Sequence, residues 1–339
     1  RIRHAGVINA VIDIDRNGTI DYLYAGDVHG NFYRFDLCRA DLESTTQEDE
    51  SASDWYGGGL RQCKYGAGIS GQWRVTKIFS VRSSLGSVQP ALSKPIVVAH
   101  PSGVGVIVIF ATGRYSNRSD ITDTALQSIY GLWDRFSDSV IPKSALVKQK
   151  YTAVCESLVS GGSEVDDSRI CARTLSSNPV NYAIPTDDSD GILGWYNELA
   201  VTAEGDPTTI EHPGERAIRN IQLRGGLAFV NSVLPRQGAD TCSSVTGGFA
   251  LAFCPVTGGL QCQEEGIFDL NNDGLFDQLA GDGTNRILAA YGFGSATPSD
   301  SAFLGERRFT QTSDGTLDAV LTNTKRTIRT GRMSWRRIN

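Results

Sequence analysis

The sequence lacks long apolar runs, long blocks of like charge and the motifs of common hydrolases. No stretch approaches the roughly 18 apolar residues of a membrane-spanning helix, so we predict no integral membrane span. The net charge is −6 over 339 residues, and no basic tract suggests a nucleic-acid partner. Zinc-type Cys/His spacings, His-Glu-x-x-His and Gly-x-Ser-x-Gly are all missing. No catalytic residue can be named, and we predict that the chain is not an enzyme.

Methionine occurs once, and runs of Ala, Leu, Glu and Lys at helical spacing are also lacking. Short β-branched or aromatic runs alternate instead with Gly, Asn, Asp and Ser, and there are 37 Gly. This pattern predicts an all-β sandwich, barrel or propeller. The expected strands are Val7–Ile14, Tyr22–Tyr24, Asn31–Asp36, Trp73–Val81, Ile96–Ala99, Val104–Ala111, Leu227–Val230, Phe249–Phe253, Ile287–Tyr291 and Ala319–Leu321.

Two segments are harder to assign. The stretch Ala125–Phe136 fits a short helix or a strand equally well. The segment from about Val154 to Arg216 is rich in Ser, Asp, Gly and Pro, and we expect it to be a surface insertion in a single domain spanning 1–339.

The seven cysteines lie in polar, turn-rich segments, which favours disulfides and an oxidising compartment over scattered reduced thiols. Their pairing stays open. The odd number leaves at least one cysteine unpaired or paired outside the chain. The seven are Cys38, Cys63, Cys155, Cys171, Cys242, Cys254 and Cys262.

The strongest chemical signature is the nine-residue loop 269–277, which has oxygen-bearing side chains at positions 1, 3, 5 and 9 and Gly at position 6. This spacing is typical of calcium loops, in which position 7 contributes its backbone carbonyl. An EF-hand would need Glu at position 12, where Ala280 stands, so we predict a calcium loop between strands. The candidate ligands are Asp269, Asn271, Asp273, Leu275 (carbonyl) and Asp277.

A second loop near the start repeats this spacing and is a candidate for a second calcium site. Each loop is followed by Ala-Gly-Asp and then by an Asn, which suggests one structural device used twice, as in a propeller. The alternative for either loop is a tight turn that binds no metal. The candidate ligands of the second site are Asp13, Asp15, Asn17, Thr19 (carbonyl) and Asp21.

Several landmarks, in this order, resemble the PilC/PilY family of type IV pilus biogenesis factors and tip-associated adhesins. The first is Tyr24-Ala25-Gly26-Asp27, continued by Gly30-Asn31-Phe32 and Phe35-Asp36-Leu37. The others are Ala111-Thr112-Gly113-Arg114-Tyr115, Gln127-Ser128-Ile129-Tyr130-Gly131-Leu132-Trp133-Asp134, Gly194-Trp195-Tyr196 and Gly214-Glu215-Arg216. The matches span most of the chain.

The resemblance implies a carboxy-terminal, quinoprotein-like β-propeller domain with loop insertions. The family's earlier blades would precede Arg1, so we expect either the later part of a propeller or a divergent one. It also implies calcium binding at Asp269, Asn271, Asp273, Leu275 and Asp277.

By the same resemblance, the protein would be exported through the periplasm and outer membrane to the cell surface and pilus tip. Calcium there would regulate pilus extension and retraction, twitching motility and surface adhesion. The expected partners are pilin, minor pilins and host-surface ligands. Two alternatives stay open: a quinoprotein-like dehydrogenase that uses calcium to hold pyrroloquinoline quinone, and a metal-stabilised propeller adhesin outside the pilus system.

Overall fold

The computed structural model describes residues 10–12, 20–37, 74–154, 158–160, 163–164, 172–182, 191–203, 206–235, 247–280 and 286–324. Its regular elements there are β-strands and two short 3-10 helices, η3 (Arg118–Ile121) and η4 (Lys143–Ala145). The all-β prediction is therefore confirmed. Within these ranges no helix is long and apolar enough to cross a bilayer.

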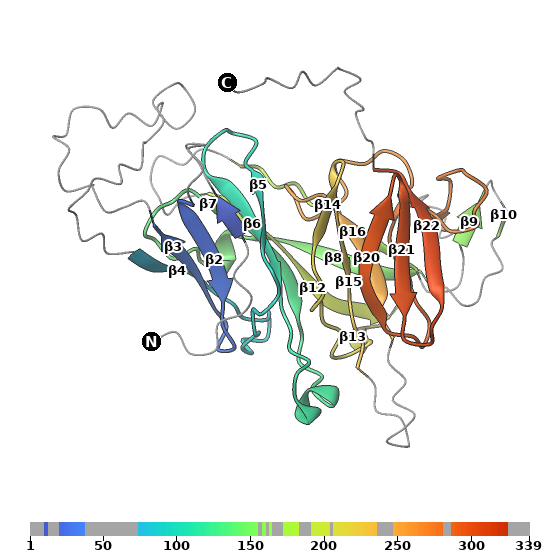
Figure 1. Ribbon diagram of the computed structural model, residues 1–339, viewed down its shortest axis with the longest axis horizontal. Coiled ribbons are helices and arrows are strands. Elements are labelled where there is room, and N and C mark those ends of the chain that lie inside the picture. Colours follow the sequence, from blue (N-terminus) through green and yellow to red (C-terminus); the bar gives the residue numbers. More distant parts are fainter. Residues whose placement is uncertain are drawn as a thin grey trace, which may run out of the picture.

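The first strands form a four-stranded antiparallel sheet in simple chain order, as in a propeller blade (Figure 1). Side chains of β3 alternate between the core and a half-exposed face, so that Phe32 and Arg34 point inward. A second four-stranded sheet closes the chain in the order β17-β22-β21-β20. The strands are β1 (Ala10–Ile12), β2 (Tyr22–Gly26), β3 (Asn31–Asp36), β4 (Arg74–Ser80), β17 (Phe268–Asp269), β20 (Pro298–Leu304), β21 (Arg307–Thr312) and β22 (Leu317–Thr322).

A long sheet lies between these two, in the order β14-β15-β16-β19-β11-β8-β12-β7-β6-β5, with β13 paired to β12. Its strand pairs are antiparallel except that of β12 with β8, which is parallel and joins two antiparallel halves. The strands are β5 (Ile96–Ala99), β6 (Val106–Ala111), β7 (Ser128–Asp134), β8 (Val147–Val154), β11 (Ala172–Leu175), β12 (Gly194–Ala203), β13 (Asp206–Glu211), β14 (Gln222–Arg224), β15 (Leu227–Asn231), β16 (Phe249–Phe253) and β19 (Leu288–Gly292).

The ambiguous stretch 125–136 contains a strand. Every residue of β7 is buried, and the strand pairs with β6 on one side and β12 on the other. A helix there would leave the centre of the sheet without its hydrogen-bonding partner.

The expected surface insertion at about 154–216 is wrong for the parts that form β11 and β12. Both strands lie within the long sheet, and Trp195 and Asn197 of β12 have no exposed surface. The polar composition of the whole segment concealed the short run Gly194–Ala203, in which Asn197 and Glu198 interrupt the continuous apolar run expected of a strand packed on both faces.

An aromatic cluster connects the two hydrophobic cores of the protein. The His100 ring stacks on Trp133 with ring centroids 3.9 Å apart, and Tyr182 meets both rings edge-on. Tyr182 packs against both cores. His100 is buried, its Nδ1 lies 2.6 Å from the Ser102 hydroxyl, and its Nε2 has no hydrogen-bond partner.

This cluster makes the stability depend on pH. Burial lowers the pKa of His100 from 6.5 to about 4, because the buried ring favours its neutral form. Above pH 6.5 the His100 ring is neutral in both the folded and the unfolded protein, and its burial costs no ionisation energy. As the pH falls from 6.5 towards 4, the unfolded state takes up a proton that the folded state does not, so the free energy of unfolding falls. We expect wild type to lose about 2–3 kcal/mol more unfolding free energy between pH 7 and pH 4.5 than His100→Phe, measured by urea denaturation. Equal losses in the two proteins would contradict this assignment.

Candidate functional site

The loop 269–277 leaves β17 and enters β18 (Leu279–Ala280), so it lies between strands as predicted. Strand β18 pairs with β9 (Leu158–Ser160), which pairs with β10 (Ser163–Glu164), and the three strands form a small antiparallel sheet. The loop therefore connects the last blade-like sheet with this small one.

Asp269 fixes the start of the loop. It has no exposed surface, and its carboxylate accepts hydrogen bonds from the Asp273 and Gly274 backbone N–H groups at 3.2 and 3.0 Å. Asn272 and Gly274 have positive φ angles of 58° and 85°, a conformation that Asn tolerates and Gly favours. The Asx-Gly pattern in the sequence therefore produces a tight turn around a buried carboxylate.

The other predicted ligands lie around this turn. The Asn271 amide donates to Asp273 Oδ2 at 2.8 Å, and Asp273 Oδ1 accepts from the Leu275 N–H at 2.8 Å. Leu275 exposes 57% of its surface, and only its carbonyl was predicted to bind metal. Asp277 is half-buried. Sequence reasoning missed Gln278, whose amide donates to Asn271 Oδ1 at 3.0 Å and Asp277 Oδ1 at 2.9 Å.

These donors are chemically suited to a hard cation, because all of them are carboxylate, amide or carbonyl oxygens. In the described part of the chain no three His, Cys, Asp or Glu side chains already surround a common point. The Asp273 carboxylate instead accepts hydrogen bonds from its neighbours in the loop. A bound cation would replace some of these bonds, while Asp269 is already held in place by the backbone.

Most of the second predicted site, at positions 13 to 19, lies outside the described residues. Asp21 alone is described, and it is buried, with its backbone bonded to Ile12 and Leu37. In the Ala-Gly-Asp element that follows, the Asp27 carboxylate accepts from the backbone N–H groups of His29 and Asn31, which caps the β2–β3 turn. Its counterpart Asp282 lies outside the described residues.

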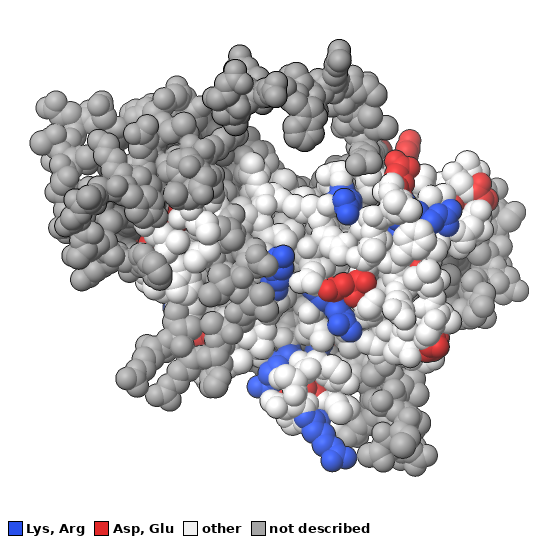
Figure 2. Space-filling view, in the orientation of Figure 1, with Lys and Arg blue, Asp and Glu red and all other residues white. Residues whose placement is uncertain are grey.

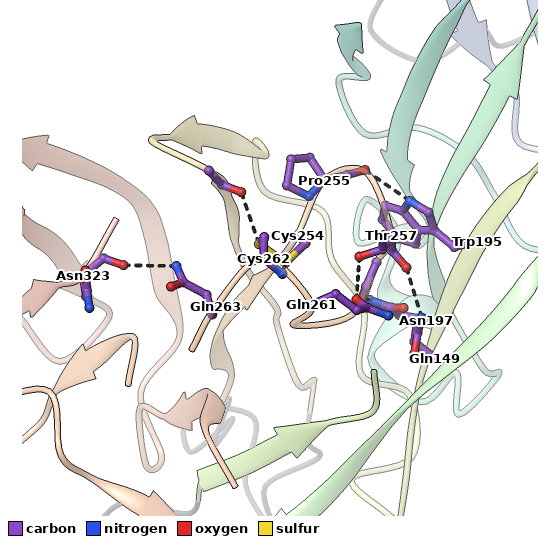
Figure 3. Close-up of a disulfide and its surroundings, with 12 residues drawn as sticks. Gln149, Trp195, Asn197, Cys254, Pro255, Thr257, Gln261, Cys262, Gln263 and Asn323 are labelled. Carbon is purple, nitrogen blue, oxygen red and sulfur yellow. Dashed lines mark hydrogen bonds between the residues drawn. A yellow bond between two sulfur atoms is a disulfide. The ribbon is translucent and has the colours of Figure 1, made fainter. Parts of the chain in front are cut away.

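A disulfide-closed loop, residues 254–262, packs on the middle of the long sheet (Figure 3). The Cys254–Cys262 bond confirms the prediction of a disulfide, and the other five cysteines lie outside the described residues. Buried side chains of β8 and β12 hold this loop through its carbonyls: Trp195 Nε1 donates to Pro255, Asn197 to Gly258 and Gln149 to Thr257. The disulfide-closed loop is thus held against the parallel pair of β8 and β12.

The comparisons with known proteins agree with this architecture. Residues 6–151 match the family model described as the PilY1 beta-propeller domain. The chain is 28% identical over 268 residues to the type IV pilus biogenesis factor PilY1 of Pseudomonas aeruginosa strain PAO1, an alignment covering 78% of this chain and 21% of that protein. A PilY1 homolog of Xylella fastidiosa is 28% identical over 322 residues, covering 95% of this chain and 21% of the homolog. The resemblance to the PilC/PilY family is confirmed.

The fold is confirmed by a solved structure of the Pseudomonas aeruginosa PilY1 C-terminal domain. The TM-score is 0.67 at 22% sequence identity, covering 94% of this chain and 61% of the other. The chain is therefore all-β with a fold similar to that of the PilY1 C-terminal domain, and its residues 6–151 are similar to the PilY1 beta-propeller domain. It spans about a fifth of the length of these curated PilY1 relatives.

Proposed function

We propose that this chain is the calcium-binding domain of a type IV pilus biogenesis factor. Its similarity to PilY1 proteins over most of its length supports the connection with pili. The observation that carries the calcium proposal is the buried Asp269 carboxylate, fixed by two backbone N–H groups at the head of an all-oxygen donor set. Asp269, Asn271, Asp273, Asp277 and the Leu275 carbonyl would hold the ion.

In this proposal the domain performs no catalysis, and calcium acts by ordering the loop. The ion would change the affinity of the domain for pilin, minor pilins or a host-surface ligand, by favouring the loop conformation that binds them. The protein would act outside the cell at the pilus tip, where it adjusts pilus extension and retraction, twitching motility and adhesion.

The charges on one face of the described residues suit a protein partner better than a nucleic acid. On the face drawn in Figure 2, basic and acidic side chains of the described residues are scattered and form no continuous basic surface. Nucleic-acid binding generally needs such a surface, because most of its affinity comes from neutralised phosphates.

Calcium titration by calorimetry tests the site. We expect wild type to bind calcium and Asp273→Ala to bind it more than 100-fold more weakly, because a ligand carboxylate contributes more than the outer-shell groups whose loss typically costs about 10–100-fold. Glu306→Ala removes an exposed carboxylate outside the loop and is the matched control, which should bind like wild type. Equal affinities of Asp273→Ala and wild type would refute the assignment of this loop.

The role in pili needs a separate experiment in cells. A strain that carries Asp273→Ala in the full-length protein should lose twitching motility or fail to retract its pili. If the purified variant no longer binds calcium but the strain twitches normally, calcium has only a structural role.

A further inference from the structure

Gln278 is a buried side chain that contacts two of the proposed calcium ligands, Asn271 and Asp277, without being a ligand itself. It is 1% exposed. Its Nε2 donates to Asn271 Oδ1 at 3.0 Å and to Asp277 Oδ1 at 2.9 Å, and its Oε1 accepts from the Leu270 N–H at 3.0 Å. A primary amide has two donor hydrogens, so this arrangement uses both of them and one acceptor position.

We propose that Gln278 is the positioning residue of the calcium loop and transmits its occupancy to the β10-β9-β18 sheet. This inference rests on the calcium site proposed above. Gln278 would thus hold the calcium ligands in place before the ion binds. It would also connect the loop to strands β9 and β10, which are distant in the sequence.

The positioning role follows from the hydrogen bonds of the Gln278 amide. Asn271 and Asp277 stand at positions 3 and 9 of the loop, and without a cation two oxygens brought close together repel each other. The Gln278 amide places N–H groups between them and holds both oxygens near the turn. Asn271 Oδ1 also accepts the Asp273 N–H at 3.3 Å, and a bound metal would replace this longer bond while the Gln278 bond stays in place. Ligand-orienting partners of this kind typically contribute about 10–100-fold to metal affinity.

The coupling role follows from the position of Gln278 in the chain. The next two residues, Leu279 and Ala280, form β18 and pair with Val159 and Leu158 of β9. Strand β9 pairs in turn with β10 through Val159 and Ser160. When calcium occupies the loop, the Gln278 side chain is fixed, and β18, which begins at the next residue, is fixed with it. Since β9 and β18 share only two residue pairs, we expect the sheet to open often when the loop is unsupported.

The test uses Gln278→Met, which keeps the length and volume of the side chain but cannot donate or accept these hydrogen bonds. We expect it to bind calcium about 10–100-fold more weakly than wild type by calorimetry. Hydrogen exchange of a peptide covering 158–164 should slow on calcium addition in wild type and change little in the variant at the same calcium concentration. Gln311→Met makes the same chemical change at an exposed position of β21 and should match wild type in both measurements.

The outcomes separate this inference from the calcium site itself. If wild type binds no calcium, both proposals fail. If wild type binds and Gln278→Met binds equally well, the site stands and the positioning role is refuted. If affinity falls but exchange at 158–164 does not respond to calcium in wild type, the coupling is refuted. Exchange of β6 and β7 without calcium, unchanged from wild type, checks that the variant is folded, and Gln278→Leu repeats the test with a branched side chain.

Discussion

Glu215→Ala is expected to lower the free energy of unfolding by about 3–5 kcal/mol, because it leaves a buried guanidinium without its counter-charge. Arg173 and Glu215 form a two-pronged ion pair, with N–O distances of 3.0 and 2.8 Å, and neither side chain exposes more than 1% of its surface. The Ser232 hydroxyl donates to the same carboxylate at 2.5 Å. Arg173 also lies 3.4 Å from the centroid of the Phe249 ring. Chemical denaturation followed by tryptophan fluorescence measures the loss.

The double variant Arg173→Met/Glu215→Leu distinguishes the cost of an unpaired charge from the contribution of the pair. Replacing both partners of a buried pair with apolar residues is often close to neutral. We therefore expect the double variant to be more stable than Glu215→Ala alone. If it is as unstable as the single variant, the loss comes from the packing around β11 and not from an isolated charge.

Gly258→Ala is expected to lower the free energy of unfolding by about 3 kcal/mol. Its φ angle of +69° already disfavours any side chain, and a methyl group there would lie 2.2 Å from Cε3 of Trp195. Strain of this kind costs about 1–2 kcal/mol, and overpacking a close contact adds about 1–3 kcal/mol. Because Trp195 is fully buried, the ring cannot move aside without disturbing β12. Thermal unfolding with and without the substitution measures the effect.

Gly294→Ala is the matched control for this prediction. Gly294 has a similar φ angle of +62°, but a methyl group there would meet no atom within 4 Å. It should show the backbone cost alone, about 1–2 kcal/mol. Equal losses for the two substitutions would show that the contact with Trp195 contributes nothing.

The sequence predicted the strands that alternate or stay apolar over their whole length. Strand β3 was predicted with its observed bounds, and β5 and β16 likewise, because their residues carry the signal of a half-buried or fully buried strand. Strands β8 and β12 were missed. Their buried positions include Gln149 and Asn197, which are polar because they bind the carbonyls of the stapled loop. A local pattern cannot indicate a partner about 60 to 110 residues away.

The candidate site likewise has one part that the sequence predicted and another that only the fold reveals. The candidate calcium ligands from Asp269 to Asp277 could be proposed because their spacing is a property of one short loop. Gln278 carries no such signal, since a single Gln before a strand is common and its importance depends on three contacts made in the fold. The Cys254–Cys262 pairing was likewise left open, because the spacing of seven cysteines allows many combinations.

The parallel pairing of β12 with β8 has a consequence for how the protein can be divided and made. Strands β7 and β8 follow one another in the chain, yet β12, which begins 40 residues after β8 ends, lies between them. When the ribosome has synthesised the chain as far as β8, strands β7 and β8 both still lack β12, the strand with which each of them pairs. Contacts between residues this far apart in the sequence slow folding, and the edges of β7 and β8 stay unpaired until β12 has been made. The segment 6–151, although it is the part that matches a propeller model, ends inside β8 and is not a unit that can be excised intact.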